Sequence, residues 1–321
     1  MLKKTFVKIY IKLGLGLLIS VLFWVLMMPI VFSVRAQEIP INVGNLGSVH
    51  LLLGNPSDAS LDGSDPNNLL MIKRQYALSY NGSKSIANWV SWQLGSEWLG
   101  EETRCQNPPG RDYFRPDTAL PSGYNPVFSE DYTGTGFDRG HIIPSSDRTN
   151  NHTDNCATFL MTNIMPQSPD VNQGPWKTLE EQGRYLVNEE NKKLYIIAGG
   201  TGKGGEGREG FKYSFTGKRS LNTIAVPASS WKVMVVLEQP QMGLAEITEN
   251  TRIIAVNMPH KQGVRGDCWN VKENGSFKYI TSVDEIEKLT GYDLLSNLPK
   301  EIQDVIEAKA DEGLGFNSCS L

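Results

Sequence analysis

The chain has 321 residues, 40% of them hydrophobic, so it is long enough to bury a substantial core. Its 31 Lys and Arg residues are outnumbered by 35 Asp and Glu residues, which gives a net charge of −4. This balance argues against a protein that grips nucleic acid with its whole surface. Any nucleic-acid site must instead be a local cluster of arginines on an acidic body.

Residues 1–36 have the pattern of an export signal. Four lysines between residues 3 and 12 precede an apolar run over 13–34, and Val34-Arg35-Ala36 places small residues where a signal peptidase cuts. We favour a cleaved signal peptide over an uncleaved membrane anchor, which the length of the run would also allow. Both interpretations predict a secreted or periplasmic catalytic part. Cleavage would leave 26 basic against 35 acidic residues, a net charge of −9.

The mature chain is expected to consist of a linker over 37–48, one domain over 49–312 and a tail over 313–321. In chain order, Val49–Gly54 predicts a short apolar strand, and a polar loop over 57–68 follows. Leu69–Tyr80 has strand character and ends at the turn signal Asn81-Gly82. Ile86–Leu94 is expected to pair back on that strand. Segments 100–112 and 114–132 are polar or proline-rich and predict irregular structure.

From Asn172 onward the apolar residues recur at helical spacing, with Pro175 in the first turn, where proline is tolerated. This spacing favours packing of Trp176 in the core over base stacking. Three later runs predict strands, and residues 283–310 predict helices broken at Gly291 and Pro299. The three predicted strands are Lys193–Ala198, Trp231–Leu237 and Arg252–Asn257.

The glycine-rich segment over 199–210 lacks the GxxxxGK[ST] pattern ahead of a helix, so we do not interpret it as a phosphate-binding loop. No internal repeat is visible. Strands interleaved with a few helices predict a mixed α+β domain.

The chain has four cysteines: Cys105, Cys156, Cys268 and Cys319. An even number in an exported chain predicts disulfides, and four cysteines allow three pairings. None lies in a CxxC pair, so no zinc site is expected. Cys156 lies beside an apolar stretch, and a buried free thiol is the alternative at that position.

The run Phe137-Asp138-Arg139-Gly140-His141 is the first candidate for chemistry. One well-placed imidazole can serve as a general base, and the following Ile142-Ile143-Pro144 predicts a short buried strand. Gly140 would let the backbone approach a bulky group such as a phosphodiester. Arg139 offers a planar donor fork that matches phosphate oxygens. The alternative for His141 is an ordinary core histidine.

Downstream residues favour the catalytic interpretation. Asn172 and Glu180 are about two helical turns apart and are expected near one helix face, while Glu180 and Arg184 are spaced to meet as an i,i+4 pair. A solvated helix with a surface ion pair is the alternative. An amide oxygen from Asn172 suits Mg²⁺, which keeps most of its waters when it binds protein oxygens.

The other histidines are assigned structural or surface positions. His50 stands among leucines and is expected to be structural. His152 and His260 are expected to be solvent-facing loop residues.

Taken together, these motifs resemble the DNA/RNA non-specific endonucleases, a family of ββα-metal or His-Me finger nucleases, and especially the secreted cyanobacterial type. The likeness extends weakly over residues 49–311, which is most of the mature chain. It rests on several ordered motifs: Phe114–Asp117, Tyr132–His141, Pro144–Arg148, Asn155–Gln167, Asn172–Trp176, Leu179-Glu180 and Arg184.

The resemblance implies a ββα-metal motif within the α+β fold and a role for each site residue. His141 would deprotonate the attacking water, and Asn172 would be the direct ligand of a hydrated Mg²⁺, with Mn²⁺ as a substitute. Glu180 would hold metal-bound water, and Arg139 and Arg184 would bind phosphate. Asn163 would support the site from behind, and Asp138 would either be structural or orient its neighbours. DNA and RNA, single- or double-stranded, would be cut to leave 5′ phosphates.

One departure concerns an upstream arginine that the family carries four residues before the Phe of the FRPD segment. Here Gly110 stands at that position. Arg111 is our first choice for the missing arginine, Arg104 the second and Arg115 the third. Residues 105–109 look like an insertion, and Cys105 would tie it to Cys268 or Cys319.

Two rival functions remain open. A non-enzymatic binding protein would keep the fold, but it would need neither a base nor a metal ligand. A dedicated RNase or a nuclease toxin with a cognate protein inhibitor would keep both. Membrane association is expected only if the leader is not cleaved.

Overall fold

The computed structural model describes residues 48–315, all within one unit over Val43–Leu321. The expected leader, nearly all of the linker and most of the tail lie outside the described residues. Within the described part, no helix is long and apolar enough to cross a membrane.

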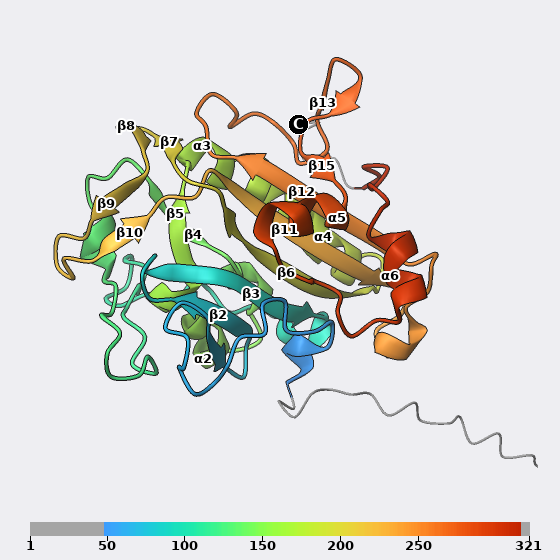
Figure 1. The fold of residues 1–321 in the computed structure, drawn as a ribbon, viewed down its shortest axis with the longest axis horizontal. Helices are drawn as coiled ribbons and strands as arrows, with labels where there is room; N and C mark the ends of the chain where they lie inside the picture. The colour runs from blue at the N-terminus through green and yellow to red at the C-terminus, as the bar shows by residue number, and fades with distance from the viewer. Residues whose placement is uncertain (1–47, 316–321) are drawn as a thin grey trace, which may run out of the picture. The chain divides into compact units, whose positions relative to one another are not determined.

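A seven-stranded sheet, with every neighbouring pair antiparallel, forms the centre of the domain (Figure 1). Its strands in spatial order are β1 (Leu69–Ile72), β2 (Ala77–Asn81), β3 (Ile86–Leu94), β6 (Lys193–Thr201), β11 (Ser229–Leu237), β12 (Arg252–Pro259) and β15 (Ile280–Thr281).

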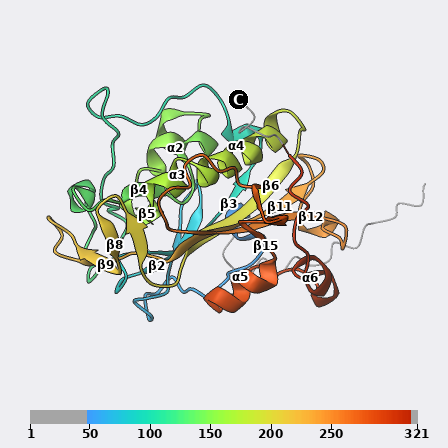
Figure 2. The same cartoon turned by 90° about the horizontal axis from the view of Figure 1, so that it is seen from above.

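Helices cover both faces of this sheet, as Figure 2 shows from above. One face carries α2 (His152–Ala157), α3 (Pro169–Asn172) and α4 (Pro175–Asn188). The other carries α5 (Val283–Thr290) and α6 (Lys300–Ile306). Each layer has its own core, so alternate residues of β11 pack on opposite sides. Burial on both faces explains why the central strands are continuous apolar runs in the sequence.

Small hairpins and single turns of 3₁₀ helix complete the described fold. The two-stranded pairs are β4 (Asp138–His141) with β5 (Ile164–Gln167), β7 (Gly205–Gly207) with β8 (Gly210–Lys212), β9 (Ser214–Thr216) with β10 (Thr223–Ala225), and β13 (Lys272–Glu273) with β14 (Ser276–Phe277). The 3₁₀ turns are η1 (Val49–Leu51), η2 (Ser96–Trp98), η3 (Ser129–Tyr132), η4 (Ser145–Asp147), η5 (Met161–Asn163) and η6 (Leu244–Glu246).

The α+β prediction is confirmed, and so are most of its elements. Ile86–Leu94 pairs with β2, and the three later apolar runs form β6, β11 and β12. The C-terminal helices break at the predicted positions. Gly291 ends α5 in the left-handed conformation with a φ of 76°, and α6 begins directly after Pro299.

Two predicted strands are wrong. Val49–Leu51 is a 3₁₀ turn, because the Ser48 side chain accepts a hydrogen bond from the His50 amide and the buried His50 ring anchors the segment. Leu69–Tyr80 is a hairpin rather than one strand. A tight turn over 73–76 separates β1 from β2, since the Lys73 amide donates to the Tyr76 carbonyl.

The disulfide expectations are also corrected. Cys105 is bonded to Cys156, with 5.0 Å between their Cα atoms, and not to Cys268 or Cys319. Cys156 is therefore not a free thiol. Cys268 is disulfide-bonded as well, and Cys319 lies outside the described residues.

Candidate functional site

The predicted base His141 is the last residue of strand β4. This strand pairs with β5, and His141 lies directly opposite Ile164. The rings of Phe114 and Phe159 pack on its imidazole, with centroids 5.2 Å and 4.8 Å away. Burial lowers the pKa of His141 to about 3, and the charge of Arg104 acts in the same direction. The imidazole is therefore neutral at neutral pH, which is the form a general base must start from. Its Nε2 is buried and has no hydrogen-bond partner within residues 48–315.

Asn172 lies on α3 and not on the same helix as Glu180, contrary to the prediction. Helix α3 ends at Asn172, and the backbone turns at Gly174 before α4 begins. A Cβ on Gly174 would lie 2.5 Å from the Asp170 carbonyl oxygen, so only glycine fits this sharp junction. The loop re-aims Asn172 toward β4, where its Nδ2 donates to Asp138 Oδ2 at 2.9 Å.

Asp138 thus has the orienting position predicted for it. The same carboxylate oxygen also accepts from Gln173 Nε2 at 2.6 Å. The amide nitrogen of Asn172 donates to Asp138, whereas the Oδ1 atom of Asn172 accepts no hydrogen bond from any described residue. An amide oxygen oriented in this way and left unpaired fits a hard cation that keeps most of its waters. The donor set at this position therefore fits the metal that the family implies.

Glu180, on α4, does not pair with Arg184. Its Oε1 lies 3.7 Å from Nζ of Lys232, a lysine only 1% exposed on the α4 side of β11. The Lys232 ammonium also lies over the Trp176 ring at 4.1 Å. Burial raises the pKa of Glu180 to about 7, while the charges of Lys232 and Arg184 act in the opposite direction.

Arg184 instead bonds to Asp147, with 3.0 Å between Nη1 and Oδ1. The other oxygen of Asp147 accepts from the Trp92 indole. Both charged groups are largely buried, so the alternative of a solvated helix with a surface ion pair is wrong. Trp176 packs in the core, as predicted.

Arg139 lies on β4, two residues before His141, and part of its guanidinium is already hydrogen-bonded. Its Nε and Nη2 donate to the Ser129 carbonyl at 3.0 Å and 2.7 Å, and its guanidinium lies 5.7 Å from the centre of the Phe114 ring. Within the described part of the chain, Nη1 makes no hydrogen bond. Arg139 therefore keeps a donor for an anion.

Asn163 supports the turn after His141. It is fully buried, accepts from the Ile143 amide and donates to the carbonyls of Ile143 and Thr158. The structure gives its own reason for a glycine at position 140. A Cβ there would lie 2.0 Å from Oε1 of Gln167, so the bulky group that requires glycine is this cross-strand side chain.

The three candidate upstream arginines occupy different places around a small hairpin over 105–112. The hairpin closes through the bridge between Gln106 and Asp112, and the Asn107 amide donates to the Arg111 carbonyl. Arg104, at its base, bonds to Asp112 and to Ser145 Oγ, and its guanidinium lies 5.0 Å from the centre of the Phe159 ring.

The guanidinium groups of Arg111 and Arg115 do not stack on Phe114 or Phe159 within the described residues. Arg111 is exposed, and its charge adds to the burial that lowers the pKa of Arg139. Arg115 donates to the Cys156 carbonyl and stacks on Tyr113. Only Arg104 among the three perturbs His141.

Three side chains of this region received no role from the sequence: Lys232, Asp147 and Gln167. A signal for Lys232 did exist, because a lysine inside the apolar run Trp231–Leu237 is expected to be paired when buried. Conversely, His260 was assigned to the surface but is buried, with Nε2 2.7 Å from Ser230 Oγ. His50 is buried and structural, and His152 is exposed, although it lies on α2 rather than in a loop.

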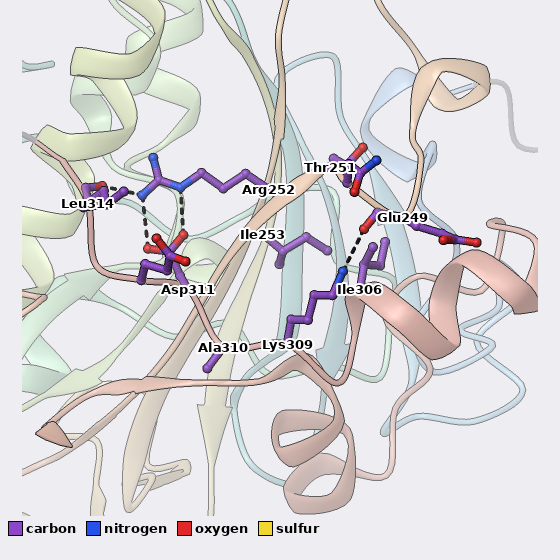
Figure 3. A pocket seen from close by; sticks show the side chains of 11 residues that line it. Glu249, Thr251, Arg252, Ile253, Ile306, Lys309, Ala310, Asp311 and Leu314 are labelled. Carbon is purple, nitrogen blue, oxygen red and sulfur yellow. Dashed lines mark hydrogen bonds and ion pairs between the residues drawn. The ribbon is translucent and has the colours of Figure 1, made fainter.

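A pocket of about 280 Å³ lies elsewhere, at the start of β12 (Figure 3). Its polar groups bond to one another, since Arg252 pairs with Asp311 and Lys309 donates to the Glu249 carbonyl. None of the predicted site residues lines it.

Comparison with known proteins agrees with this geometry. The family model described as DNA/RNA non-specific endonuclease matches residues 58–301. A protein named Nuclease from Nostoc sp. is 50% identical over 82% of this chain and 86% of its own length. Human Endonuclease G, a mitochondrial protein, is 30% identical over 52% of this chain and 54% of its own.

In fold, the chain is similar to EndoG in a crystal structure of the EndoG/EndoGI complex. The TM-score is 0.59 at 20% identity, and the match covers 81% of this chain and 96% of that one. The β4–β5 hairpin followed by α4 is the ββα unit that the sequence predicted. The chain belongs to the DNA/RNA non-specific endonucleases, metal-dependent nucleases that act on nucleic acids.

Proposed function

We propose that this enzyme is an exported, Mg²⁺-dependent nuclease that cuts DNA and RNA with little sequence preference and leaves 5′ phosphates. The observation that carries the proposal is the neutral His141 imidazole, whose buried Nε2 has no partner among the described residues. A buried polar atom without a partner is costly unless something else binds it, and an attacking water would do so.

In this mechanism His141 accepts a proton from water as the water oxygen attacks phosphorus, and the bond to the 3′ oxygen breaks. The free Nη1 of Arg139 and the guanidinium of Arg184 neutralise the phosphate. Asp138 orients Asn172, which would hold the metal, and Glu180 would hold water bound to it. When bound at Asn172, Mg²⁺ would supply stabilisation of the leaving 3′ oxygen.

For the upstream arginine we propose Arg104 ahead of Arg111. Arg104 lies over Phe159, which packs against His141, and its charge acts on that imidazole. The hairpin after it returns the chain to Phe114, so an insertion leaves Arg104 beside the site. Arg111, the first choice from the sequence, stays a prediction for the upstream arginine.

The test is digestion of plasmid DNA and of RNA with Mg²⁺, with EDTA, and with the His141→Ala variant. We expect cleavage of both substrates, abolition by EDTA, and a loss of roughly 10²–10⁴-fold in the variant. His152→Ala, which alters an exposed histidine, is the matched control. Cleavage that persists in EDTA or in His141→Ala would sink the mechanism. Salt-sensitive binding without cleavage would favour the binding-protein alternative.

Export is proposed from the leader alone. Expression in a bacterial host with Edman sequencing of the released protein should give a mature chain that starts near Gln37. Recovery of full-length protein in the membrane fraction would favour an uncleaved anchor.

A protein inhibitor is a further expected partner. EndoG, which is similar in fold, is inhibited in its complex with EndoGI. An inhibitor of this chain would be expected to cover the same strand–helix site.

A further inference from the structure

A basic segment borders the candidate site and has no role in the proposed mechanism. We name residues 203–219 the flap; it comprises β7, β8, β9 and the loops that join them. In a chain of net charge −4, the flap carries five basic residues against two acidic ones, Glu206 and Glu209. The basic residues are Lys203, Arg208, Lys212, Lys218 and Arg219.

The flap exposes two aromatic rings. Phe211 is 57% exposed and Tyr213 is 70% exposed, and their rings meet edge to face with centroids 5.1 Å apart. Both rings lie over the backbone of Gly204, where an added Cβ would come within 2.5 Å of Phe211 and 2.8 Å of Tyr213. The aromatic pair thus has a defined position on the surface, and neither ring is buried by a neighbouring element.

The flap is attached to the segment that leads into β4. The Arg208 amide donates to the Gly136 carbonyl at 2.9 Å, and Lys212 Nζ donates to the Thr135 carbonyl at 2.6 Å. Phe215 stacks on Phe137, the residue immediately before Asp138, with the ring planes 19° apart. Figure 1 places β7–β10 beside β4 and β5, and Figure 2 shows β8 and β9 there as well.

The opposite side of the flap is held as well. The Gly204 amide donates to the Val226 carbonyl, and the Glu206 amide donates to the His260 carbonyl. These bonds fix the flap at two edges, so its outer side chains keep their place relative to the strand that carries Arg139 and His141.

The outer charges of the flap are available to an anion. Lys203, Arg208 and Lys218 are exposed and form no ion pair with any residue of the described range. Arg219 is partly committed, because it pairs with Glu130 and lies over the Phe128 ring.

We propose that the flap is a binding subsite for a single-stranded stretch of the nucleic-acid substrate. Bases stack on Phe211 and Tyr213, and Lys203, Arg208 and Lys218 contact the adjoining phosphates. Stacking accepts every base because each has a π face, which suits an enzyme without sequence preference. This inference rests on the proposed function, since it assigns one more contact to the same substrate.

The test measures binding apart from cleavage. Fluorescence anisotropy with a labelled short oligodeoxythymidine is recorded in the His141→Ala background, with and without Phe211→Ala/Tyr213→Ala. We expect the Kd to rise roughly tenfold to a hundredfold, as when stacking platforms lose their rings. The control is Leu61→Ala/Leu289→Ala, which removes equally exposed apolar side chains outside the flap and should leave the Kd unchanged.

A second variant tests the charges. Lys203→Gln/Arg208→Gln/Lys218→Gln should lower the slope of log K against log salt by about 2, because each phosphate contact to a single strand adds about 0.7. The control Lys272→Gln/Lys288→Gln/Lys300→Gln removes the same charge from β13, α5 and α6 and should leave the slope unchanged. In the active enzyme, both flap variants should raise KM and spare kcat.

The outcomes separate the two proposals. If the wild type cleaves but the aromatic flap variant binds the oligonucleotide as tightly as its control does, the flap inference is overturned and the nuclease mechanism stands. If the wild type does not cleave with Mg²⁺, the mechanism fails, and the flap is judged by the binding data alone.

Discussion

Burial shifts the pKa values of His141 and Glu180, two ionisable groups of the candidate site. It lowers the pKa of His141 and raises that of Glu180, so each group is pushed toward its neutral form. A neutral imidazole is what a base requires, whereas a neutral carboxyl would be a poor partner for metal-bound water. Lys232 offsets part of this effect, because its charge favours the ionised form of Glu180 and limits the rise of its pKa to about 7.

Replacing Lys232 with Met should therefore shift the pH dependence of cleavage. Without the ammonium, the pKa of Glu180 rises above about 7, so the carboxylate forms only at higher pH. The acidic limb of the kcat/KM profile should move upward by about one unit, with a roughly tenfold loss of activity at neutral pH that recovers under alkaline conditions. Lys192→Met, near the start of β6, is the control. An unshifted limb in a folded variant would contradict this role.

Asp138 offers a second prediction at this scale. Because it holds the amide of Asn172, Asp138→Ala should raise the Mg²⁺ concentration needed for half-maximal activity by roughly 10–100-fold. Titration of cleavage rate against Mg²⁺ measures this. Asp170→Ala removes a carboxylate from the same short helix as Asn172 and should leave the midpoint where it is. A drop in rate that no concentration of Mg²⁺ restores would speak against an orienting role.

At the scale of single elements, the decisive features are breaks and insertions. The turn at Gly174 divides an apparently continuous helical pattern, and this division lets Asn172 face β4 while Glu180 faces β11. The hairpin over 105–112 is an insertion beside the site, but its two ends lie together, so Arg104 and Phe114 both stay next to His141. The Cys105–Cys156 disulfide ties the base of this hairpin to α2.

The double variant Cys105→Ser/Cys156→Ser should lose roughly 2–4 kcal/mol of unfolding free energy, since the bond closes a long loop. Urea denaturation at neutral pH measures the change. We also expect lower kcat, because Arg104 adjoins the released hairpin. Single Ser variants treated with a thiol-blocking reagent control for stray disulfides. Wild-type stability in the double variant would show that the bond is not structural.

At the scale of the whole molecule, the sheet separates two layers with different electrostatics. The layer with α2, α3 and α4 holds the candidate site. The layer with α5 and α6 holds three carboxylates, Asp284, Glu287 and Glu307, with oxygens within 4.8 Å of one another. Burial, together with the negative charges of Glu287 and Asp293, raises the pKa of Glu307 to about 7.

The raised pKa of Glu307 leads to a prediction of how the stability of the folded protein depends on pH. A folded-state pKa above the unfolded value of about 4.5 means that the folded chain binds the proton more tightly. The stabilisation is fully present below about pH 4.5 and is lost as the pH rises toward 7. Glu307→Gln should therefore raise stability near pH 8 by roughly 1–2 kcal/mol and change little near pH 4. Thermal melts across this pH range measure the change, with Glu301→Gln at an exposed position as the control. If Glu307→Gln and Glu301→Gln shift stability alike, the raised pKa of Glu307 does not control the pH dependence.

The positions of single histidines show how far sequence could predict the site. His50 among leucines was placed correctly inside, since local apolar context and burial agree there. His260 was placed outside, because its neighbours Pro259 and Lys261 are typical of loops. It is buried because the end of β12 returns against β11, where Ser230 meets its ring. Contacts between strands distant in sequence leave no local signal.

By itself the sequence determined the α+β class, most central strands, the C-terminal helices and the set of residues around His141. Those follow from apolar periodicity, turn residues and motif spacing, which are local. Tertiary structure decided which charges meet: Glu180 with Lys232, Arg184 with Asp147, and Cys105 with Cys156. It also placed the flap beside β4. These pairs join residues that are far apart in the sequence and meet only when the helices pack on the sheet. Residue spacing along the chain therefore does not predict them.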